Sequence, residues 1–169
     1  EIDRAIWKLG KDLNYQKPYD DPRVKVHIDD ARAFLKKTKK KYDVIILGTL
    51  DSQTLLSGMS SIRLDNYIYT TESFRSVREH LKPEGILILY HMSINPATSF
   101  KFAKILMDIF GVPPLIHHEK EHRLINFTLV AGSNAEAVNE FGDSFPKLND
   151  IEFANQFAPP IDDWPYLYL

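Results

Sequence analysis

Hydrophobic and polar positions along this chain follow two different spacings. Residues 44–47 form a short apolar run rich in β-branched side chains, and residues 86–90 form a second one. Uninterrupted apolar runs of this length are typical of strands buried on both faces of a parallel sheet. Residues 24–28 alternate between apolar and polar positions, which predicts another strand. Two last strands, joined as a hairpin, are expected over residues 115–117 and 124–131.

Between these runs the apolar residues recur at helical spacing. Ile6, Leu9 and Leu13, for example, fall on one face of a helix. The pair Asp29-Asp30 and either Thr70 or Thr71 are suited to cap two later helices, because their side-chain oxygens can accept from backbone N–H groups. The expected helices cover residues 4–14, 31–40, 71–81, 95–110 and 134–141, with a polar loop over 55–66 and an irregular tail from 142. Strands that alternate with helices predict an α/β fold, a mostly parallel sheet with helices on both faces.

Composition narrows the function classes. The sequence has 169 residues and a net charge of -2, and it contains no cysteine. This length suits one well-buried domain, and the charge gives no reason to expect a nucleic acid partner. Disulfides and thiolate metal sites are excluded. No apolar stretch approaches the ~20 residues of a membrane span. Because the chain starts at Glu1 without Met, we expect it to be a piece of a longer protein.

Functional residues are expected first of all just after the strand at 44–47, since parallel sheets bind ligands outside the carboxyl ends of their strands. His91 follows the run 86–90 and could act as an acid or base near neutral pH, or be a hydrogen-bonded histidine at a strand end. Tyr67 and Tyr69 could wall a pocket, although core packing is the better interpretation. The remaining histidines do not predict a metal site, because they lack closed ligand geometry. They are His117, His118 and His122.

Several motifs, in order and spacing, resemble the spermidine/spermine synthase family of aminopropyltransferases. They occupy residues 1–3, 21–24, 30–31, 42–46 and 81–86. The resemblance implies the Rossmann-like sheet of class I S-adenosylmethionine-dependent transferases, with an antiparallel last strand and the first strands missing here. Residues 70–72 and 162–169 more closely resemble a membrane-anchored branch of the family. Residues 1–133 are therefore expected to form a partial synthase-like domain, and 134–169 an extension leading towards a membrane segment.

The resemblance also implies how a nucleoside would be held. Glu1 matches the acidic residue that accepts from the ribose hydroxyls, and Asp30 matches the one that takes the adenine amino group, with Ala31 backing the ring. Glu1 could instead be a terminal residue without a role, and Asp30 a plain N-cap; capping and nucleoside binding are compatible. The implied cofactor is S-adenosylmethionine or its decarboxylated form, without a metal.

The sequence departs from the family where a base is needed. The family carries Asp-Ser/Thr-Ser/Thr-Asp after this central strand, whereas here the stretch reads Gly48-Thr49-Leu50-Asp51. Gly48 stands in place of the catalytic aspartate and cannot accept a proton, while Asp51 keeps the carboxylate that holds the polyamine cation. The family's glycine-rich turn after the first strand is also absent from these residues.

Two functions remain open. One is an enzyme domain that binds an S-adenosyl compound and transfers an aminopropyl or methyl group, which the retained Glu1, Asp30 and Asp51 favour. The other is a catalytically inactive synthase-like module for ligand sensing or assembly in a membrane protein, which Gly48 favours. The expected partners are a nucleoside and a polyamine, with a homodimer as a further expectation. The expected location is the cytoplasmic side of a membrane, as a soluble domain of a larger protein.

Overall fold

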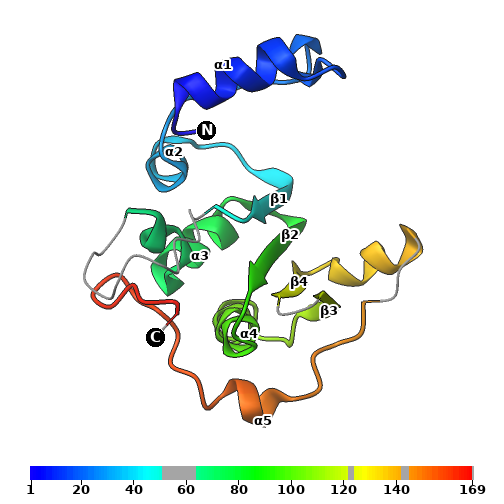
Figure 1. Cartoon of the computed structure of the whole chain (residues 1–169). Helices are drawn as coiled ribbons and strands as arrows, with labels where there is room; N and C mark the ends of the chain where they lie inside the picture. Colours follow the sequence, from blue (N-terminus) through cyan, green and yellow to red (C-terminus); the bar gives the residue numbers. More distant parts are fainter. Residues whose placement is uncertain (51–63, 122–123, 142–144, 169) are drawn as a thin grey trace. The chain divides into compact units, whose positions relative to one another are not determined.

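The computed structural model of this chain describes residues 1–50, 64–121, 124–141 and 145–168. The chain divides into two compact units, residues 1–39 and 40–169. Figure 1 draws the first unit in blue shades and the second from cyan to red. This division falls after residue 39 and does not test the domain boundary expected at residue 133, so that boundary stays a prediction. Among the described helices, none is both long and apolar enough to cross a membrane.

The first unit contains two capped helices. The side chain of Asp3 accepts from the backbone N–H of Ala5 at 2.7 Å and begins α1 (Arg4–Leu13). Asp30 accepts from the N–H of Ala33 at 2.9 Å and begins α2 (Ala31–Lys37). Both helices and the cap at Asp30 are therefore confirmed, although α2 ends three residues before the predicted end at residue 40. A short 3-10 turn, η1 (Pro18–Asp20), lies between them.

The strand predicted over residues 24–28 is wrong. The described part of the first unit has no strand there. A strand needs a neighbour to pair its backbone groups. Here the stretch is held by the N-terminal residue instead: the amino group of Glu1 donates to the carbonyl of His27, and the N–H of Asp29 donates to the carbonyl of Glu1. The alternating pattern therefore did not lead to a sheet strand in the described part of this unit.

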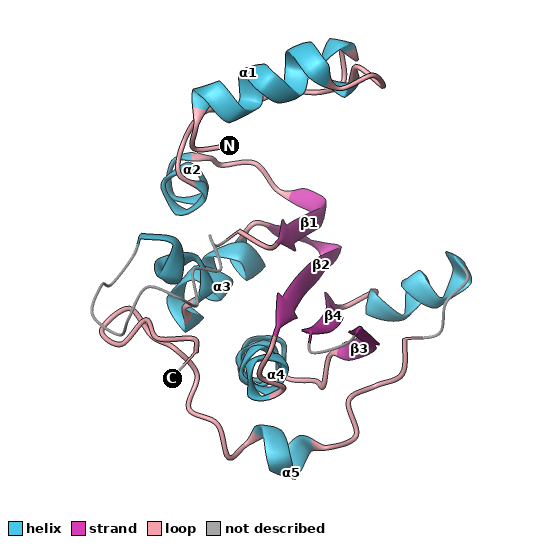
Figure 2. Ribbon diagram, viewed as in Figure 1, coloured by secondary structure: helices cyan, strands magenta, loops and turns pink. Residues whose placement is uncertain are grey.

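The second unit is built on a four-stranded sheet in the order β1-β2-β4-β3 (Figure 2). Its strands are β1 (Tyr42–Gly48), β2 (Leu81–Ser93), β3 (Leu115–Glu121) and β4 (Leu124–Gly132). β1 and β2 are parallel, whereas β2 and β4, and β3 and β4, are antiparallel. The predicted closing hairpin is confirmed. Three of the four described strands, β1, β2 and β3, therefore run in the same direction, and the last strand, β4, runs against them, so the sheet is mixed and has the expected antiparallel last strand.

Burial differs between the two faces of this sheet. Leu87, Leu89 and His91 alternate along β2 on a buried face, whereas Val44 and Ile46 of β1 are 45% and 59% exposed. The prediction that β1 is buried on both faces is therefore wrong within this unit. The apolar run correctly marked a strand, but an edge strand covered on one face gives the same run as a central one.

Two helices cover the buried face. They are α3 (Thr71–Glu79) and α4 (Ala97–Phe110). α3 is capped by Thr70 as predicted, but it ends two residues before Leu81, which begins β2. Three shorter helices complete the unit: η2 (Leu64–Tyr69), η3 (Ala135–Phe141) and α5 (Ile151–Ala154). α5 interrupts the tail that was expected to be irregular. Helices on both faces were predicted; within this unit, α3 and α4 pack on one.

Aromatic rings fill the layer between α4 and the sheet. Phe102 is fully buried, and its ring lies 5.1 Å from Tyr69, 6.0 Å from Phe74 and 6.0 Å from Phe127 between ring centroids. Phe74 of α3 is fully buried as well, so each covering helix places an aromatic side chain in the core. Tyr69, fully buried here, packs in the core as the sequence suggested.

The C-terminal segment is tied to the beginnings of both covering helices. Thr70 Oγ1 donates to Asp162 Oδ1 at 2.6 Å, and Thr71 Oγ1 donates to the carbonyl of Pro160 at 3.1 Å. The buried Lys101 Nζ donates to the carbonyl of Leu167 at 2.9 Å. The tail is thus part of the packed unit over these residues.

Replacing the central ring should cost much of the stability of this unit. We expect Phe102→Ala to lower the free energy of unfolding by about 3–5 kcal/mol, because it removes buried surface and leaves a cavity. Urea unfolding followed by circular dichroism measures this. The matched control is Phe153→Ala, at a partly exposed ring, which should cost clearly less. Equal losses in the two variants would show that Phe102 is not the centre of the core.

Candidate functional site

The carboxyl ends of β1 and β2 meet at one edge of the sheet, where the sequence predicted a site. Gly48 pairs with Tyr90, and the N–H of Thr49 donates to the carbonyl of Tyr90 at 3.2 Å. Thr49 has φ 35°, a left-handed conformation uncommon for a residue with a branched side chain. The N–H of Leu50 then donates to the Tyr69 hydroxyl at 2.7 Å. These bonds fix how the chain leaves β1.

The ring of Tyr90 occupies the place that a side chain on Gly48 would take. A Cβ on Gly48 would lie 1.9 Å from Cζ and 2.1 Å from the hydroxyl oxygen of Tyr90. Contacts this short are impossible, so any side chain at position 48 requires the Tyr90 ring to move. Tyr90 is 50% exposed, and its ring is the far end of a flexible side chain, so the ring can move. The glycine is therefore tied to the tyrosine beside it.

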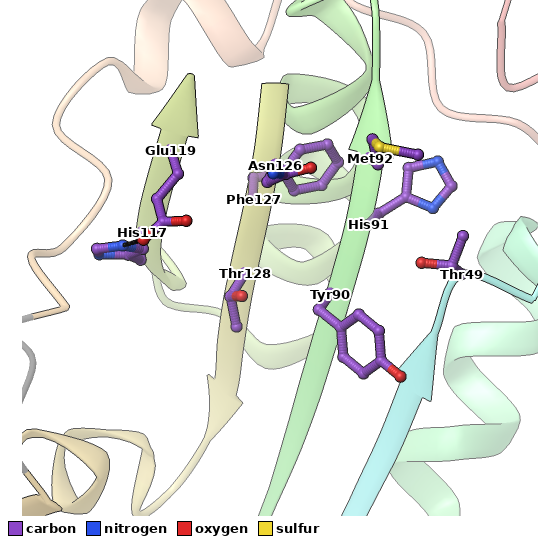
Figure 3. Close-up of a pocket in the computed structure, with 9 residues that line it drawn as sticks. All are labelled: Thr49, Tyr90, His91, Met92, His117, Glu119, Asn126, Phe127 and Thr128. Atoms are coloured by element: carbon purple, nitrogen blue, oxygen red, sulfur yellow. Dashed lines mark hydrogen bonds and ion pairs between the residues drawn. The ribbon is translucent and has the colours of Figure 1, made fainter. Parts of the chain in front are cut away.

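A pocket of about 430 Å³ opens at this edge and extends across the sheet (Figure 3). It begins at Thr49 and reaches β3 across β2 and β4. Its lining residues are Thr49, Tyr90, His91, Met92, His117, Glu119, Asn126, Phe127 and Thr128. Thr49, His91 and His117 were considered from the sequence, whereas the other lining residues were not. The polar positions of β3 and β4 alternate along their strands, and this period of two was the available signal.

His91 lies at the predicted edge with its ring in the aromatic cluster. It is 2% exposed, and its ring centroid is 5.4 Å from those of Tyr69 and Phe102. Nε2 lies 3.0 Å from the Tyr168 hydroxyl, which links the ring to the C-terminal segment. An acid or base role for His91 stays a prediction, and it would require the proton to pass through this buried contact.

Burial changes the protonation of two groups in this unit. It lowers the pKa of Lys101, whose ammonium is held by the Leu167 carbonyl. Burial, and to a smaller extent the neighbouring His117, lowers the pKa of His118. In both cases the cause is desolvation, which penalises the charged form of the side chain. His118 thus adds little positive charge near the pocket at neutral pH.

The residues predicted to hold the nucleoside belong to the first unit. Asp30 is exposed and caps α2 with one oxygen, which leaves its carboxylate further acceptor capacity for an amino group. The backbone of exposed Ala31 follows directly in the helix. A carboxylate oxygen of Glu1 accepts from the N–H of Asp3 at 3.0 Å. The carboxylates therefore suit a ligand that donates hydrogen bonds.

The structure brings Gly48 and His91 to one edge of the second unit. Asp51 and His122, by contrast, lie outside the described residues. His117 Nε2 lies 3.5 Å from Glu119 Oε1, a pairing of opposite charges only when the histidine is protonated. In the part of the chain that the structure describes, no group of three potential ligands could hold a metal ion.

The fold defines the class of protein. A probable spermidine synthase from Corynebacterium glutamicum superimposes with a TM-score of 0.65 at 20% identity, over 96% of this chain and 62% of that one. Human methyltransferase-like protein 13, solved in complex with SAH, gives 0.58 at 20% identity, over 96% of this chain and 72% of that one. The chain thus has the α/β fold shared by spermidine synthases and methyltransferases.

The sequence comparison then gives the family. Residues 1–105 match the spermine/spermidine synthase domain, and the chain belongs to this family. A polyamine aminopropyltransferase from Nitrosomonas europaea is 32% identical over 117 residues. The matched region covers 66% of this chain and 33% of that relative, so the chain spans a minor part of the relative's length.

The contact between Gly48 and Tyr90 predicts an energetic coupling. We expect Gly48→Ala to destabilise the protein by no more than about 1 kcal/mol, because the added methyl group displaces a ring that is half exposed and can turn aside. In a Tyr90→Ala background the same change should cost almost nothing, since the ring is gone. A double-mutant cycle from urea unfolding measures the difference. An equal cost in both backgrounds would show that positions 48 and 90 are not energetically coupled.

Proposed function

We propose that this chain is the nucleoside-binding domain of an aminopropyltransferase-like protein that works without a carboxylate at residue 48. The space beside Gly48, filled by the Tyr90 ring, is the observation that carries this proposal. Membership of the spermine/spermidine synthase domain family supports the ligand class, and the retained Asp30 supports its mode of binding. Aminopropyl transfer, or methyl transfer, to an acceptor is the reaction class that such a ligand serves.

Glu1, Asp30 and Ala31 are the residues proposed to hold the nucleoside. Carboxylates at Glu1 and Asp30 would accept from the ribose hydroxyls and from the adenine amino group, and Ala31 would lie against the ring. Either S-adenosylmethionine or its decarboxylated form would supply an alkyl group on a positively charged sulfur. The protein's own contribution is to orient the acceptor and to take its proton.

The missing carboxylate limits ordinary spermidine synthesis. An attacking amine must lose a proton, and polyamine nitrogens are mostly protonated at neutral pH. Gly48 offers no group to take that proton. Asp51 is proposed to keep its family role of holding the cation.

A second candidate follows from the same observation. A module that retains nucleoside binding without a base could sense a ligand or support assembly in a larger protein. The resemblance of residues 70–72 and 162–169 to the membrane-anchored branch favours a membrane protein as that partner, with this domain on the cytoplasmic side. A homodimer is a further proposal that the family resemblance suggests.

Asp30 allows capping and ligand binding to be separated. In the full-length protein, we expect Asp30→Ser to weaken S-adenosylhomocysteine binding by about 1–3 kcal/mol, because the adenine amino group loses a charged partner. Serine is also a good N-cap, so the melting temperature should hardly change. Asp30→Ala should show the same weaker binding together with about 1 kcal/mol of lost stability. Calorimetric titration and thermal unfolding measure the two effects, and undiminished affinity in Asp30→Ser would leave Asp30 as a cap alone.

The effect of the missing base at residue 48 can be tested by measuring enzymatic activity. With putrescine and decarboxylated S-adenosylmethionine, we expect the full-length protein to form spermidine about 10²–10⁴-fold more slowly than a synthase that carries the base. Gly48→Asp combined with Tyr90→Ala, which makes room for the carboxylate, should raise the rate above that of Tyr90→Ala alone. Product is quantified by chromatography. Turnover comparable to a true synthase would refute the proposal and direct attention to His91 as the replacement base.

A further inference from the structure

Two motifs that lie about ninety residues apart in the sequence meet in the second unit. The first, residues 70–72, begins α3. The second lies in the C-terminal segment, whose residues 160–168 are here called the strap and are drawn in red beside α3 (Figure 1). The carbonyl of Pro160 accepts from Thr71 twice, from the backbone N–H at 2.9 Å and from the hydroxyl at 3.1 Å. Both motifs resemble the same branch of the family, and in the structure they contact each other directly.

Asp162 ties the strap to the residue that follows Tyr69. Its backbone N–H donates to Glu72 Oε2 at 3.0 Å, and its Oδ1 accepts from Thr70 Oγ1 at 2.6 Å. Thr70 is fully buried, so losing the carboxylate would leave its hydroxyl with a weaker set of partners and no ready access to water. Because Thr70 is the next residue in the chain, this contact restrains the backbone beside Tyr69.

Tyr168 ties the strap to the ring that packs against Tyr69. The Tyr168 hydroxyl lies 3.0 Å from His91 Nε2, and the two rings are stacked with their centroids 6.2 Å apart. The His91 ring in turn meets the Tyr69 ring edge-on, at 5.4 Å between centroids. The same end of the strap is held by Lys101, which donates to the carbonyl of Leu167. Since buried rings are close-packed, fixing the His91 ring restrains the Tyr69 ring as well.

Tyr69 holds the exit of β1. Its side chain is buried, and its hydroxyl accepts from the backbone N–H of Leu50 at 2.7 Å. The preceding residue, Thr49, has φ 35°, a conformation that persists only where surrounding contacts impose it. The hydrogen bond at Leu50 comes directly after this residue and therefore restrains it. The direction in which the chain leaves the sheet thus depends on where the Tyr69 hydroxyl stands.

We infer that the strap is a positioning element for the exit of β1, which acts on Leu50 through Tyr69. Two separate contacts of the strap converge on this tyrosine, one through the backbone from Asp162 and one through a ring from Tyr168. The inference goes beyond the proposed function, because it assigns the C-terminal segment a part in shaping the edge where the proposed site lies. Tyr69, Asp162 and Tyr168 are positioning residues, and none of them is proposed to contact a ligand.

The test is amide hydrogen exchange at Leu50 in the full-length protein without ligand. Tyr69→Phe keeps the ring and removes the acceptor, so exchange at Leu50 should become about tenfold faster, the effect of one hydrogen bond. Asp162→Ala and Tyr168→Phe should each speed this exchange about threefold, because Tyr69 keeps its hydroxyl but loses part of its restraint. Asp162→Asn keeps an acceptor oxygen for Thr70 and should restore most of the protection.

Two neighbouring residues of the strap provide matched controls. Asp163→Ala removes an exposed acid next to Asp162. Tyr166→Phe removes a hydroxyl from a ring that packs on Trp164, with the centroids 4.8 Å apart. Both variants should leave exchange at Leu50 as it is in the wild-type protein.

The Tyr69→Phe background separates positioning from a general loss of stability. Once the acceptor of Leu50 is gone, adding Asp162→Ala or Tyr168→Phe should speed its exchange no further. A loss of stability alone would speed exchange by the same factor in both backgrounds, and that result would overturn the inference. Wild-type exchange at Leu50 in both strap variants would overturn it as well. Because no ligand is present, a failure of the proposed nucleoside binding would leave this outcome unaffected.

Discussion

The parallel pairing of β1 with β2 is the constraint on which the site depends. It sets Gly48 directly beside Tyr90 and brings both strand ends to one edge. Because the ring fills the space at Gly48, the two positions cannot be chosen independently. A side chain at 48 would need another residue at 90, and a glycine at 48 leaves a gap that a large neighbour can use. The local chemistry is therefore the property of a pair of strands rather than of one motif.

The buried side of the same sheet supports this edge. The ring of Phe102 contacts Tyr69 and His91, and these two residues reach in turn to Leu50 and to Tyr168. Core packing, the exit from β1 and the C-terminal segment are thus joined through a few aromatic side chains. Close-packed interiors transmit displacements because they contain little free volume. The aromatic cluster is consequently a support for the site as well as the centre of the core.

Family membership and local chemistry point in different directions for this chain. The match over residues 1–105 assigns the family, while the proposal above is that this chain lacks a carboxylate at Gly48, at the end of β1. Function resides in the arrangement of particular groups, which a shared fold does not guarantee. The pocket across β2, β4 and β3 offers different polar groups from those expected at the strand end. A nucleoside ligand with an altered acceptor side reconciles the two.

The sequence by itself determined the elements that local pattern and capping specify. The caps at Asp30 and Thr70, the buried faces of α3 and α4 and the closing hairpin could all be predicted, because each depends on neighbours within a few residues. The family and the glycine at 48 were also readable from the chain. These features need no knowledge of which segments meet.

Only the tertiary structure decided what depends on pairing across the chain. Residues 24–28 have a strand pattern but no described partner, and β1 has an apolar run but one exposed face. Neither outcome can be predicted from the local sequence, since the same apolar pattern suits an edge strand and a central strand. The meeting of Tyr90 with Gly48 follows from register. Gly48 and Tyr90 are more than forty positions apart in the sequence, and local periodicity carries no information about contacts between such distant residues.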